Sequence, residues 1–143
     1  MQYVQGNLWD FRGPDTPVCV TTNGVIKKNG ELVMGAGVAL QAKQKFPEIP
    51  GVLGLAVKDW GNTVIYLPKH YVISFPTKND WRNPSDLGLI KQSAHKLLNL
   101  TNARNFDHVY LTPPGCGNGG LHWSVVEPIL QALFDNRFVI VLQ

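Results

Sequence analysis

Short apolar runs alternate along the chain with longer segments in which apolar residues recur every three or four positions. Runs rich in valine, isoleucine and tyrosine are typical of strands. They predict strands at residues 1–4, 18–22, 64–67, 71–75, 108–112 and 137–142. A spacing of three or four positions is that of one helix face. It predicts helices at residues 36–46, 51–59, 86–100 and 125–134, the second of them weakened by Gly54.

Residues at the helix ends indicate where the helices begin and stop. Pro47 ends the first helix, because proline cannot continue one. Ser85 is a suitable N-cap for the helix at 86–100, since its hydroxyl can accept from a free backbone N–H. Ser124 is followed three residues later by Glu127, which is the spacing of a capping box.

Strands that alternate with helices indicate a mixed or parallel sheet covered by helices on both faces. A chain of 143 residues is expected to form one domain, over residues 1–143, and it contains no repeat or linker. In such sheets, ligands bind at the carboxyl ends of the strands.

Composition narrows the class of protein. Hydrophobic residues make up 44% and charged residues 16%, which favours a compact globular protein over a disordered one. A net charge of +3 permits an anionic partner. No apolar run approaches the roughly 20 residues of a membrane span, and no signal peptide is recognised, so we expect a cytoplasmic monomer away from membranes. Cys19 and Cys116 match neither a disulfide framework nor a metal-binding spacing, so we expect no metal and no cofactor.

Two glycine-rich segments carry the strongest indication of function. Residues 115–120 include four glycines and lie between a predicted strand and a predicted helix. Without a Cβ atom, successive N–H groups can turn inward around an anion, and the following helix adds its positive dipole end. Residues 33–40 repeat this arrangement with Gly35 and Gly37. Two such loops suit a ligand with two phosphates, although neither matches the P-loop or the Rossmann fingerprint.

With these motifs the chain resembles a macrodomain over nearly its whole length. The resemblance rests on Gly6-Asn7-Leu8, Thr22-Asn23-Gly24, Met34-Gly35-Ala36-Gly37-Val38-Ala39, Phe46-Pro47, Phe75-Pro76-Thr77-Lys78 and the segment Gly115 to Trp123. It implies a three-layer α/β/α fold with a mixed central sheet that binds ADP-ribose. The Met-Gly-x-Gly loop and Thr77-Lys78 are similar to one branch, which holds glycohydrolases of terminal ADP-ribose on protein and DarG-type antitoxins that remove ADP-ribose from thymidine in DNA. Trp81-Arg82 and residues 117–121 are most similar to the DarG type.

The resemblance implies a binding site, residue by residue. Asn7 would accept from the adenine amino group in place of the usual aspartate, Leu8 would offer its N–H, and Asn23 would orient the distal ribose. The remaining ligand contacts would come from the first loop, the end of a strand and the second loop. They are Gly35, Ala36, Gly37, Val38, Thr77, Gly115, Cys116, Gly117, Asn118, Gly119, Gly120 and Leu121.

Lys78 is the candidate catalytic residue, because the matching lysine of this branch acts near the anomeric carbon of the distal ribose. Cleavage there passes through an oxocarbenium-like state. The amine could attack when neutral, or stabilise the leaving group as a cation. A solvated surface lysine is the simpler alternative. Protein-directed relatives carry an aspartate in the second loop, where this chain has Asn118-Gly119-Gly120; Asp80 could replace it, or could be an ordinary loop carboxylate.

Trp81 and Arg82 suit a nucleic-acid substrate, since an indole can stack on a base and an arginine can bind phosphate. Alternatively, Trp81 packs the loop onto the domain. Cys116 and His122 form a conceivable nucleophile and base, but a small residue under the loop is the simpler role for Cys116. We therefore expect an ADP-ribosyl glycohydrolase acting on DNA, with a toxin-like ADP-ribosyltransferase as a possible partner. The alternatives are a non-catalytic ADP-ribose reader and a hydrolase of protein-linked or small ADP-ribose derivatives.

Overall fold

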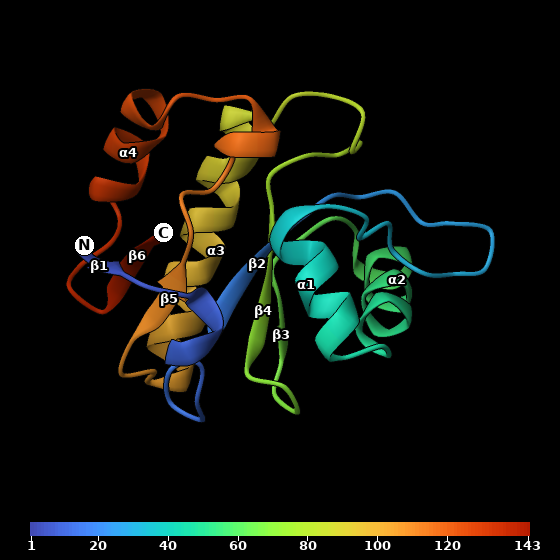
Figure 1. Ribbon diagram of the computed structural model, residues 1–143, viewed down its shortest axis with the longest axis horizontal. Helices are drawn as coiled ribbons and strands as arrows, with labels where there is room; N and C mark the ends of the chain where they lie inside the picture. Colours follow the sequence, from blue (N-terminus) through green and yellow to red (C-terminus); the bar gives the residue numbers. More distant parts are fainter.

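The six strands of the protein form one sheet in the order β1-β6-β5-β2-β4-β3, as seen in a computed structural model of all 143 residues (Figure 1). The strands are β1 (Gln2–Gln5), β2 (Val18–Thr22), β3 (Ile65–Leu67), β4 (Val72–Pro76), β5 (Val109–Leu111) and β6 (Phe138–Leu142). All neighbours are parallel except β3, which pairs antiparallel with β4. The predicted mixed sheet is confirmed.

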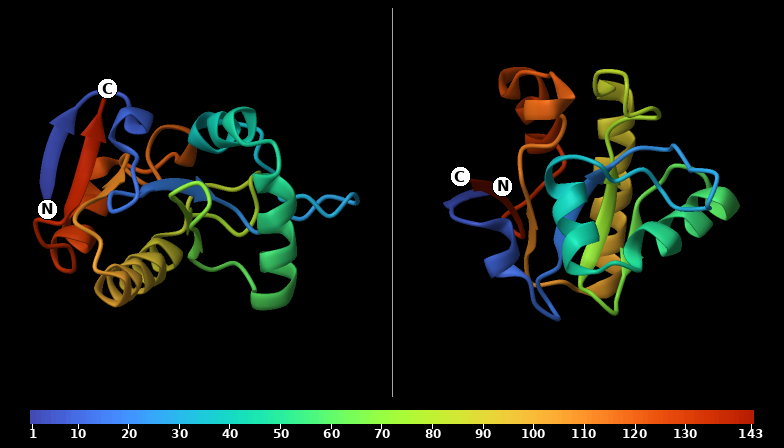
Figure 2. Two further views of the ribbon diagram at one scale, coloured as in Figure 1. Left: turned by 90° about the horizontal axis from the view of Figure 1, so that it is seen from below. Right: turned by 45° about the vertical axis from the view of Figure 1, so that its right-hand side comes forward.

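Helices cover both faces of this sheet (Figure 2). Helices α1 (Gly37–Lys45) and α2 (Ile49–Trp60) lie on one face, and α3 (Leu87–Arg104) and α4 (Trp123–Gln131) lie on the other. Two short 3-10 helices, η1 (Leu8–Phe11) and η2 (Gly117–Gly119), complete the fold. The arrangement is the three-layer α/β/α architecture expected from the sequence.

Successive side chains of each strand point to opposite faces of the sheet and pack into two separate hydrophobic cores. In β2, Val18 and Val20 belong to the core under α1 and α2, whereas Cys19 belongs to the core under α3 and α4. In β4, Val72 and Ile73 divide in the same way. Because both faces are buried, these strands read as predominantly apolar runs in the sequence, which explains why they could be predicted.

The helix caps differ from the prediction. Asp86, not Ser85, caps α3: its Oδ1 accepts from the N–H of Leu89 at 3.1 Å. Ser85 lies one residue before the cap; its N–H donates to the carbonyl of Gly119 at 2.9 Å. Helix α3 also continues past residue 100 to Arg104, where Asn105 adopts the left-handed conformation that ends it.

Helix α4 begins at Trp123, two residues earlier than the predicted capping box requires, and its N-cap is His122. Glu127 does not bond back to Ser124; its carboxylate accepts instead from the hydroxyl of Tyr3. The helix ends at Gln131 rather than at 134. Tertiary contacts with β1 thus replace the local cap that the sequence pattern predicted.

Residues 24–33 form an extended loop that projects beyond α2 (Figures 1 and 2). Its base rests on α2 at Gly54, where a Cβ atom would lie only 1.9 Å from the carbonyl oxygen of Gly30. Gly54, which weakened the helix prediction, is therefore the residue that allows the loop and α2 to touch.

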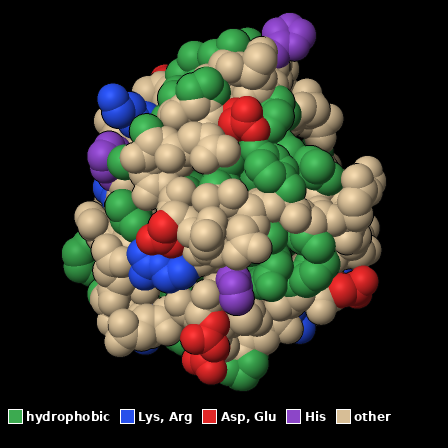
Figure 3. Space-filling view, turned by 90° about the vertical axis from the view of Figure 1, so that its left-hand side faces the viewer, with side chains coloured by type: hydrophobic (Ala, Val, Ile, Leu, Met, Phe, Trp, Pro, Cys, Tyr) green, Lys and Arg blue, Asp and Glu red, His purple; other side chains and the backbone are tan.

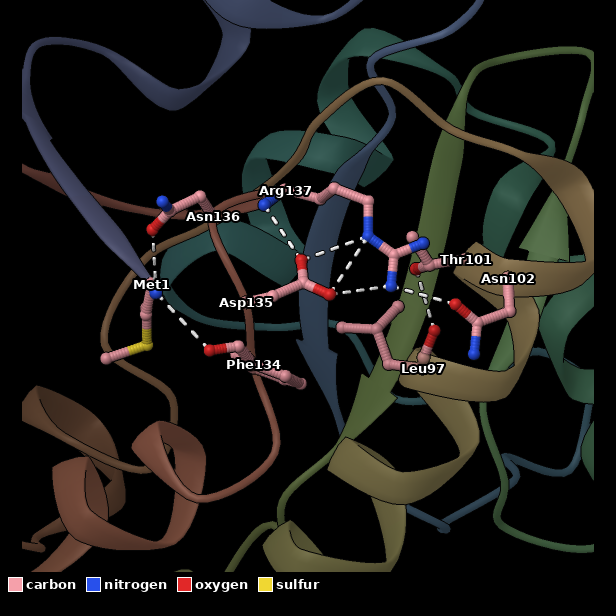
Figure 4. A network of polar contacts seen from close by, with 8 residues as sticks. All are labelled: Met1, Leu97, Thr101, Asn102, Phe134, Asp135, Asn136 and Arg137. Carbon is pink, nitrogen blue, oxygen red and sulfur yellow. Dashed lines mark hydrogen bonds and ion pairs between the residues drawn. The ribbon is translucent and has the colours of Figure 1, made fainter.

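A polar network fastens the amino-terminal end of the parallel strands (Figure 4). Arg137 bonds the carboxylate of Asp135 and the side-chain oxygen of Asn102, at 2.8 Å each from its Nη2. The amino group of Met1 donates to the carbonyl of Phe134 at 3.3 Å. The opposite, carboxyl end of the sheet carries the candidate site.

The four helices are too short or too polar to span a membrane.

Candidate active site

A cavity of about 840 Å³ opens at the carboxyl end of the sheet. Four parallel strands deliver residues to it: Asn23 follows β2, Thr77 follows β4, Thr112 follows β5, and Gln143 follows β6. This is where the topology of an α/β sheet places ligands, and the volume is that of a site for a nucleotide-sized molecule.

The first glycine loop forms one wall of the cavity, which Gly35, Ala36, Gly37 and Val38 all line. Gly37 has φ +57°, a left-handed conformation that glycine adopts without strain. No side chain caps α1 at Ala36. The first N–H groups of a helix have no intrahelical partner, and here no capping side chain accepts from them, so these groups and the helix dipole favour an anion at this point.

The second glycine loop forms the opposite wall, where Gly115, Cys116, Gly117, Asn118 and Gly119 line the cavity. Gly120 and Leu121 do not line it. The N–H groups of Gly119, Gly120 and Leu121 donate to carbonyl groups within the loop itself and hold its turn. Leu121 packs against the core under α3 and α4 and anchors the loop.

Asparagine side chains hold the two loops in place. The amide nitrogen of Asn118 lies 3.3 Å from the position that a Cβ atom of Gly37 would take, so the second loop reaches across to the first. Asn23 donates to the carbonyl of Val33 and accepts from the N–H of Val25, each at 2.9 Å. Its amide therefore supports the segment leading into the first loop as well as lining the cavity.

Lys78 lies at the edge of this cavity, where β4 leaves the sheet. Its amine donates to the carbonyl of Asn118 at 3.3 Å and to that of Trp81 at 3.5 Å. It has no ion-pair partner among the carboxylates of the chain. The neighbouring Thr77 is buried, and its N–H and carbonyl bond Thr22 and Asp86. The lysine thus extends from a fixed backbone toward the second loop.

The loop after Lys78 contains a preformed unit of Asp80, Trp81 and Arg82. The guanidinium of Arg82 bonds both carboxylate oxygens of Asp80, at 2.9 and 2.7 Å. These hydrogen bonds lower the pKa of Asp80 to about 2, so the carboxylate is engaged with Arg82 and does not pair with Lys78. Arg82 also lies 5.6 Å from the ring centroid of Trp81. Trp81 lines the cavity and is 51% exposed, whereas Arg82 lies outside it.

Asn7 and Leu8 lie outside the cavity lining. The side chain of Asn7 caps η1 by accepting from the N–H of Trp9 at 3.0 Å, and Leu8 is buried in the core. Trp9 donates from its indole nitrogen to Gln41, which does line the cavity. A role of Asn7 and Leu8 in binding the adenine remains a prediction.

Ser85 is a lining residue that the sequence did not reveal as part of the site. It is 8% exposed, and its hydroxyl oxygen is buried without a hydrogen-bond partner. A Cβ atom on Gly119 would lie 2.4 Å from this oxygen, so the hydroxyl occupies the space that the glycine leaves. Residues directly after the parallel strands, such as Thr112, could have been found from the rule for strand ends alone.

The cysteine of the second loop is not activated. Partial burial raises the pKa of Cys116, which keeps its sulfur protonated as a weakly reactive thiol. Nowhere in the chain do three or more His, Cys, Asp or Glu side chains come together to hold a metal ion.

Known structures resemble this fold closely. The chain aligns over 99% of its length with the macrodomain of Mycobacterium tuberculosis DarG, of which it covers 97%, at 33% identity and a TM-score of 0.78. The macrodomain of Thermus aquaticus DarG gives the same coverage and TM-score at 31% identity. No protein-family model matches the chain.

Curated relatives share the sequence but are longer. The DNA ADP-ribosyl glycohydrolase of Mycobacterium tuberculosis is 38% identical over 136 residues, which are 88% of this chain and 37% of that protein. A DNA ADP-ribosyl transferase-DNA ADP-ribosyl glycohydrolase fusion protein of Thermosipho africanus is 25% identical over 154 aligned positions. The chain therefore spans little more than a third of the length of the curated relatives it matches.

Proposed function

Because the chain belongs to the family of DarG macrodomains, we propose that it binds ADP-ribose and hydrolyses the bond between ADP-ribose and modified DNA. The observation that carries this proposal is the position of Lys78. Its amine lies against the second glycine loop, at 3.3 Å from the carbonyl of Asn118, at the edge of a cavity with two glycine-rich walls.

The two walls suit the pyrophosphate of the ligand. The uncapped start of α1 offers free N–H groups and a positive dipole end. The second loop faces it across the cavity. A pyrophosphate bound between the loops would leave the distal ribose beside Lys78 and Asn118. The anomeric carbon of that ribose carries the bond to be cleaved.

Hydrolysis at this carbon adds the oxygen of water and releases the base with a proton, through a state with oxocarbenium character. Lys78 has two possible roles in this step. As a neutral amine it attacks the anomeric carbon, and water then displaces it. As a cation it stabilises negative charge that develops on the leaving base. Both roles need the amine at the ribose, and both are lost on truncation to alanine.

DNA is the substrate that we favour over protein-linked ADP-ribose. The second loop has no carboxylate to assist the lysine, and Asp80 is paired with Arg82. Trp81, half-exposed at the cavity edge, offers a stacking surface for a base. Arg82 bonds Asp80 through its Nε and Nη2 atoms, so its Nη1 atom is the donor that it offers to a phosphate. The side of the molecule where β1 and α4 lie carries only scattered Lys and Arg side chains (Figure 3). We place the DNA contact at the Trp81 loop because Trp81 lines the cavity.

The test is turnover of a single-stranded oligonucleotide that carries ADP-ribosyl-thymidine, beside a protein that carries glutamate-linked ADP-ribose. Wild type and Lys78→Ala are compared on both substrates, and ADP-ribose affinity is measured by calorimetry. We expect cleavage of the DNA substrate by wild type only. Cleavage of the protein substrate alone would show that the enzyme acts on ADP-ribosylated protein and not on DNA. Micromolar ADP-ribose binding without any turnover would make the protein a reader.

We also propose that an ADP-ribosyltransferase supplies the modified substrate. This proposal rests on the Thermosipho africanus relative, whose name joins a DNA ADP-ribosyl transferase to a DNA ADP-ribosyl glycohydrolase in one protein. Mixing the purified chain with such a transferase and its DNA substrate tests it: the modification should disappear with wild type and persist with Lys78→Ala.

A further inference from the structure

Asn62 lies outside the main cavity, yet it holds the segment that carries Lys78. It belongs to the loop between α2 and β3. Its amide nitrogen donates to the backbone carbonyl of Lys78 at 2.9 Å and to the side-chain oxygen of Asn79 at 3.0 Å. One side chain therefore binds both the candidate catalytic residue and the residue that follows it.

The backbone carbonyl of Lys78 accepts no hydrogen bond from a neighbouring strand, and the bond from Asn62 takes the place of one. The preceding residue still pairs with β2, since the N–H of Thr77 donates to the carbonyl of Thr22 at 3.0 Å. At Lys78 the chain has left the sheet, and Asn62 is the single donor to its carbonyl. Without Asn62, no hydrogen bond would fix the peptide that follows the Lys78 Cα atom.

Asn62 is itself closely packed. A Cβ atom on Gly24 would come within 3.1 Å of both the carbon and the nitrogen of its amide group. The N–H of Gly24 donates to the carbonyl of Asn79 at 3.1 Å, which closes this arrangement around the Lys78 segment. The amide is thereby confined to one orientation, with its nitrogen toward Lys78.

The orientation leaves one group unsatisfied. The side-chain oxygen of Asn62 is buried without a hydrogen-bond partner. A buried acceptor without a donor reduces stability. The side chain is therefore a poor choice for stability alone, and its distinctive contribution is the pair of bonds from its nitrogen.

We propose that Asn62 is a positioning residue for Lys78: it fixes the backbone from which the amine reaches the reacting end of the ligand. The proposal rests on the proposed function. The bonds from the Lys78 amine to the carbonyls of Asn118 and Trp81 are already long, at 3.3 and 3.5 Å, so a displacement of the Lys78 backbone moves the amine out of their range. Misplacement of a reacting group by about 1 Å can lower a rate by about 100-fold.

The test compares Asn62→Ala with the control Asn79→Ala, which loses only the bond between the two asparagine side chains. We expect Asn62→Ala to lower kcat on the ADP-ribosylated oligonucleotide by about 10- to 100-fold. Its Kd for ADP-ribose should stay within about twofold of wild type, because Asn62 does not line the main cavity. Asn79→Ala should keep kcat within about threefold, since the carbonyl of Lys78 retains its donor.

A double variant separates positioning from a general structural role. If Asn62 acts through Lys78, adding Asn62→Ala to Lys78→Ala changes the residual rate no further. Unchanged kcat in Asn62→Ala would overturn the inference, as would equal losses of kcat, ADP-ribose affinity and thermal stability in both asparagine variants. These results would not contradict the proposed hydrolase function. A wild type that binds ADP-ribose but cleaves no substrate would instead refute the proposed function, and the inference with it.

Discussion

The amine of Lys78 and the backbone carbonyl of Asn118 are joined by a hydrogen bond of 3.3 Å, which connects the end of β4 to the second glycine loop. The candidate catalytic group and the proposed phosphate-binding loop are therefore in direct contact. A ligand that enters between the loops must meet both. The amine belongs to the residue after β4 and the loop is a separate segment, so mutations can test catalysis and binding one at a time.

Lys78→Ala should remove turnover while leaving binding nearly intact. The amine touches only the reacting end of the proposed ligand, and loss of a nucleophile or acid–base group lowers a rate by about 100- to 10,000-fold. Kd for ADP-ribose should change by less than about threefold, because the loops keep their geometry. Calorimetry and oligonucleotide turnover measure the two effects. Lys91→Ala, which removes an exposed lysine of α3, is the matched control.

Gly119→Glu should abolish ADP-ribose binding. Gly119 is buried, lines the cavity and has no room for a Cβ atom beside the hydroxyl oxygen of Ser85. A carboxylate there also repels the pyrophosphate, and opposed like charges cost several kcal/mol, or about 100-fold or more in Kd. Gly51→Glu adds the same charge on open helix surface and should bind normally. Retained binding by Gly119→Glu would show that the pyrophosphate lies elsewhere.

Trp81→Ala should weaken binding of the DNA substrate more than binding of free ADP-ribose. Stacking of one base on an aromatic side chain contributes about 1–3 kcal/mol, which corresponds to a rise of about 5- to 160-fold in KM for the oligonucleotide. Trp60→Ala controls for loss of an exposed indole, since Trp60 is 77% exposed at the end of α2 and lies outside the cavity lining. Equal KM values for the two tryptophan variants would assign Trp81 to packing of its loop.

The strands and the glycine loops could be predicted from the sequence because local patterns specify them. A strand buried on both faces, such as β6, is apolar at every position, and close backbone approach in the two loops requires glycine. The caps of α3 and α4 could not be predicted from local pattern: Asp86 is as suitable a cap as Ser85, and Glu127 accepts from Tyr3, far away in the chain. Asn62 has no local signal at all, since its role depends on the folding of the α2–β3 loop against β4.

Gly54→Ala should destabilise the protein by about 1–3 kcal/mol, the usual penalty of overpacking. The new Cβ atom would lie 1.9 Å from the backbone carbonyl of Gly30, which cannot rotate away as a side chain can. Gly51→Ala, in the same helix with open space around it, should instead stabilise by about 0.5–1 kcal/mol through helix propensity. Urea unfolding of both variants measures the difference. Equal stabilities would show that the loop at residues 24–33 does not rest on α2.

Ser85→Ala and Ser93→Ala should have different effects although both serines are buried and lie at or within α3. The hydroxyl of Ser93 donates to the carbonyl of Pro76 at 2.7 Å, so its removal should lower the free energy of unfolding by about 1–3 kcal/mol. The hydroxyl of Ser85 has no partner, and removing it takes away an unsatisfied group. The free energy of unfolding of Ser85→Ala should therefore lie within about 0.5 kcal/mol of the wild-type value, or exceed it. A loss as large as that of Ser93→Ala would mean that a bound water satisfies Ser85 beneath the second loop.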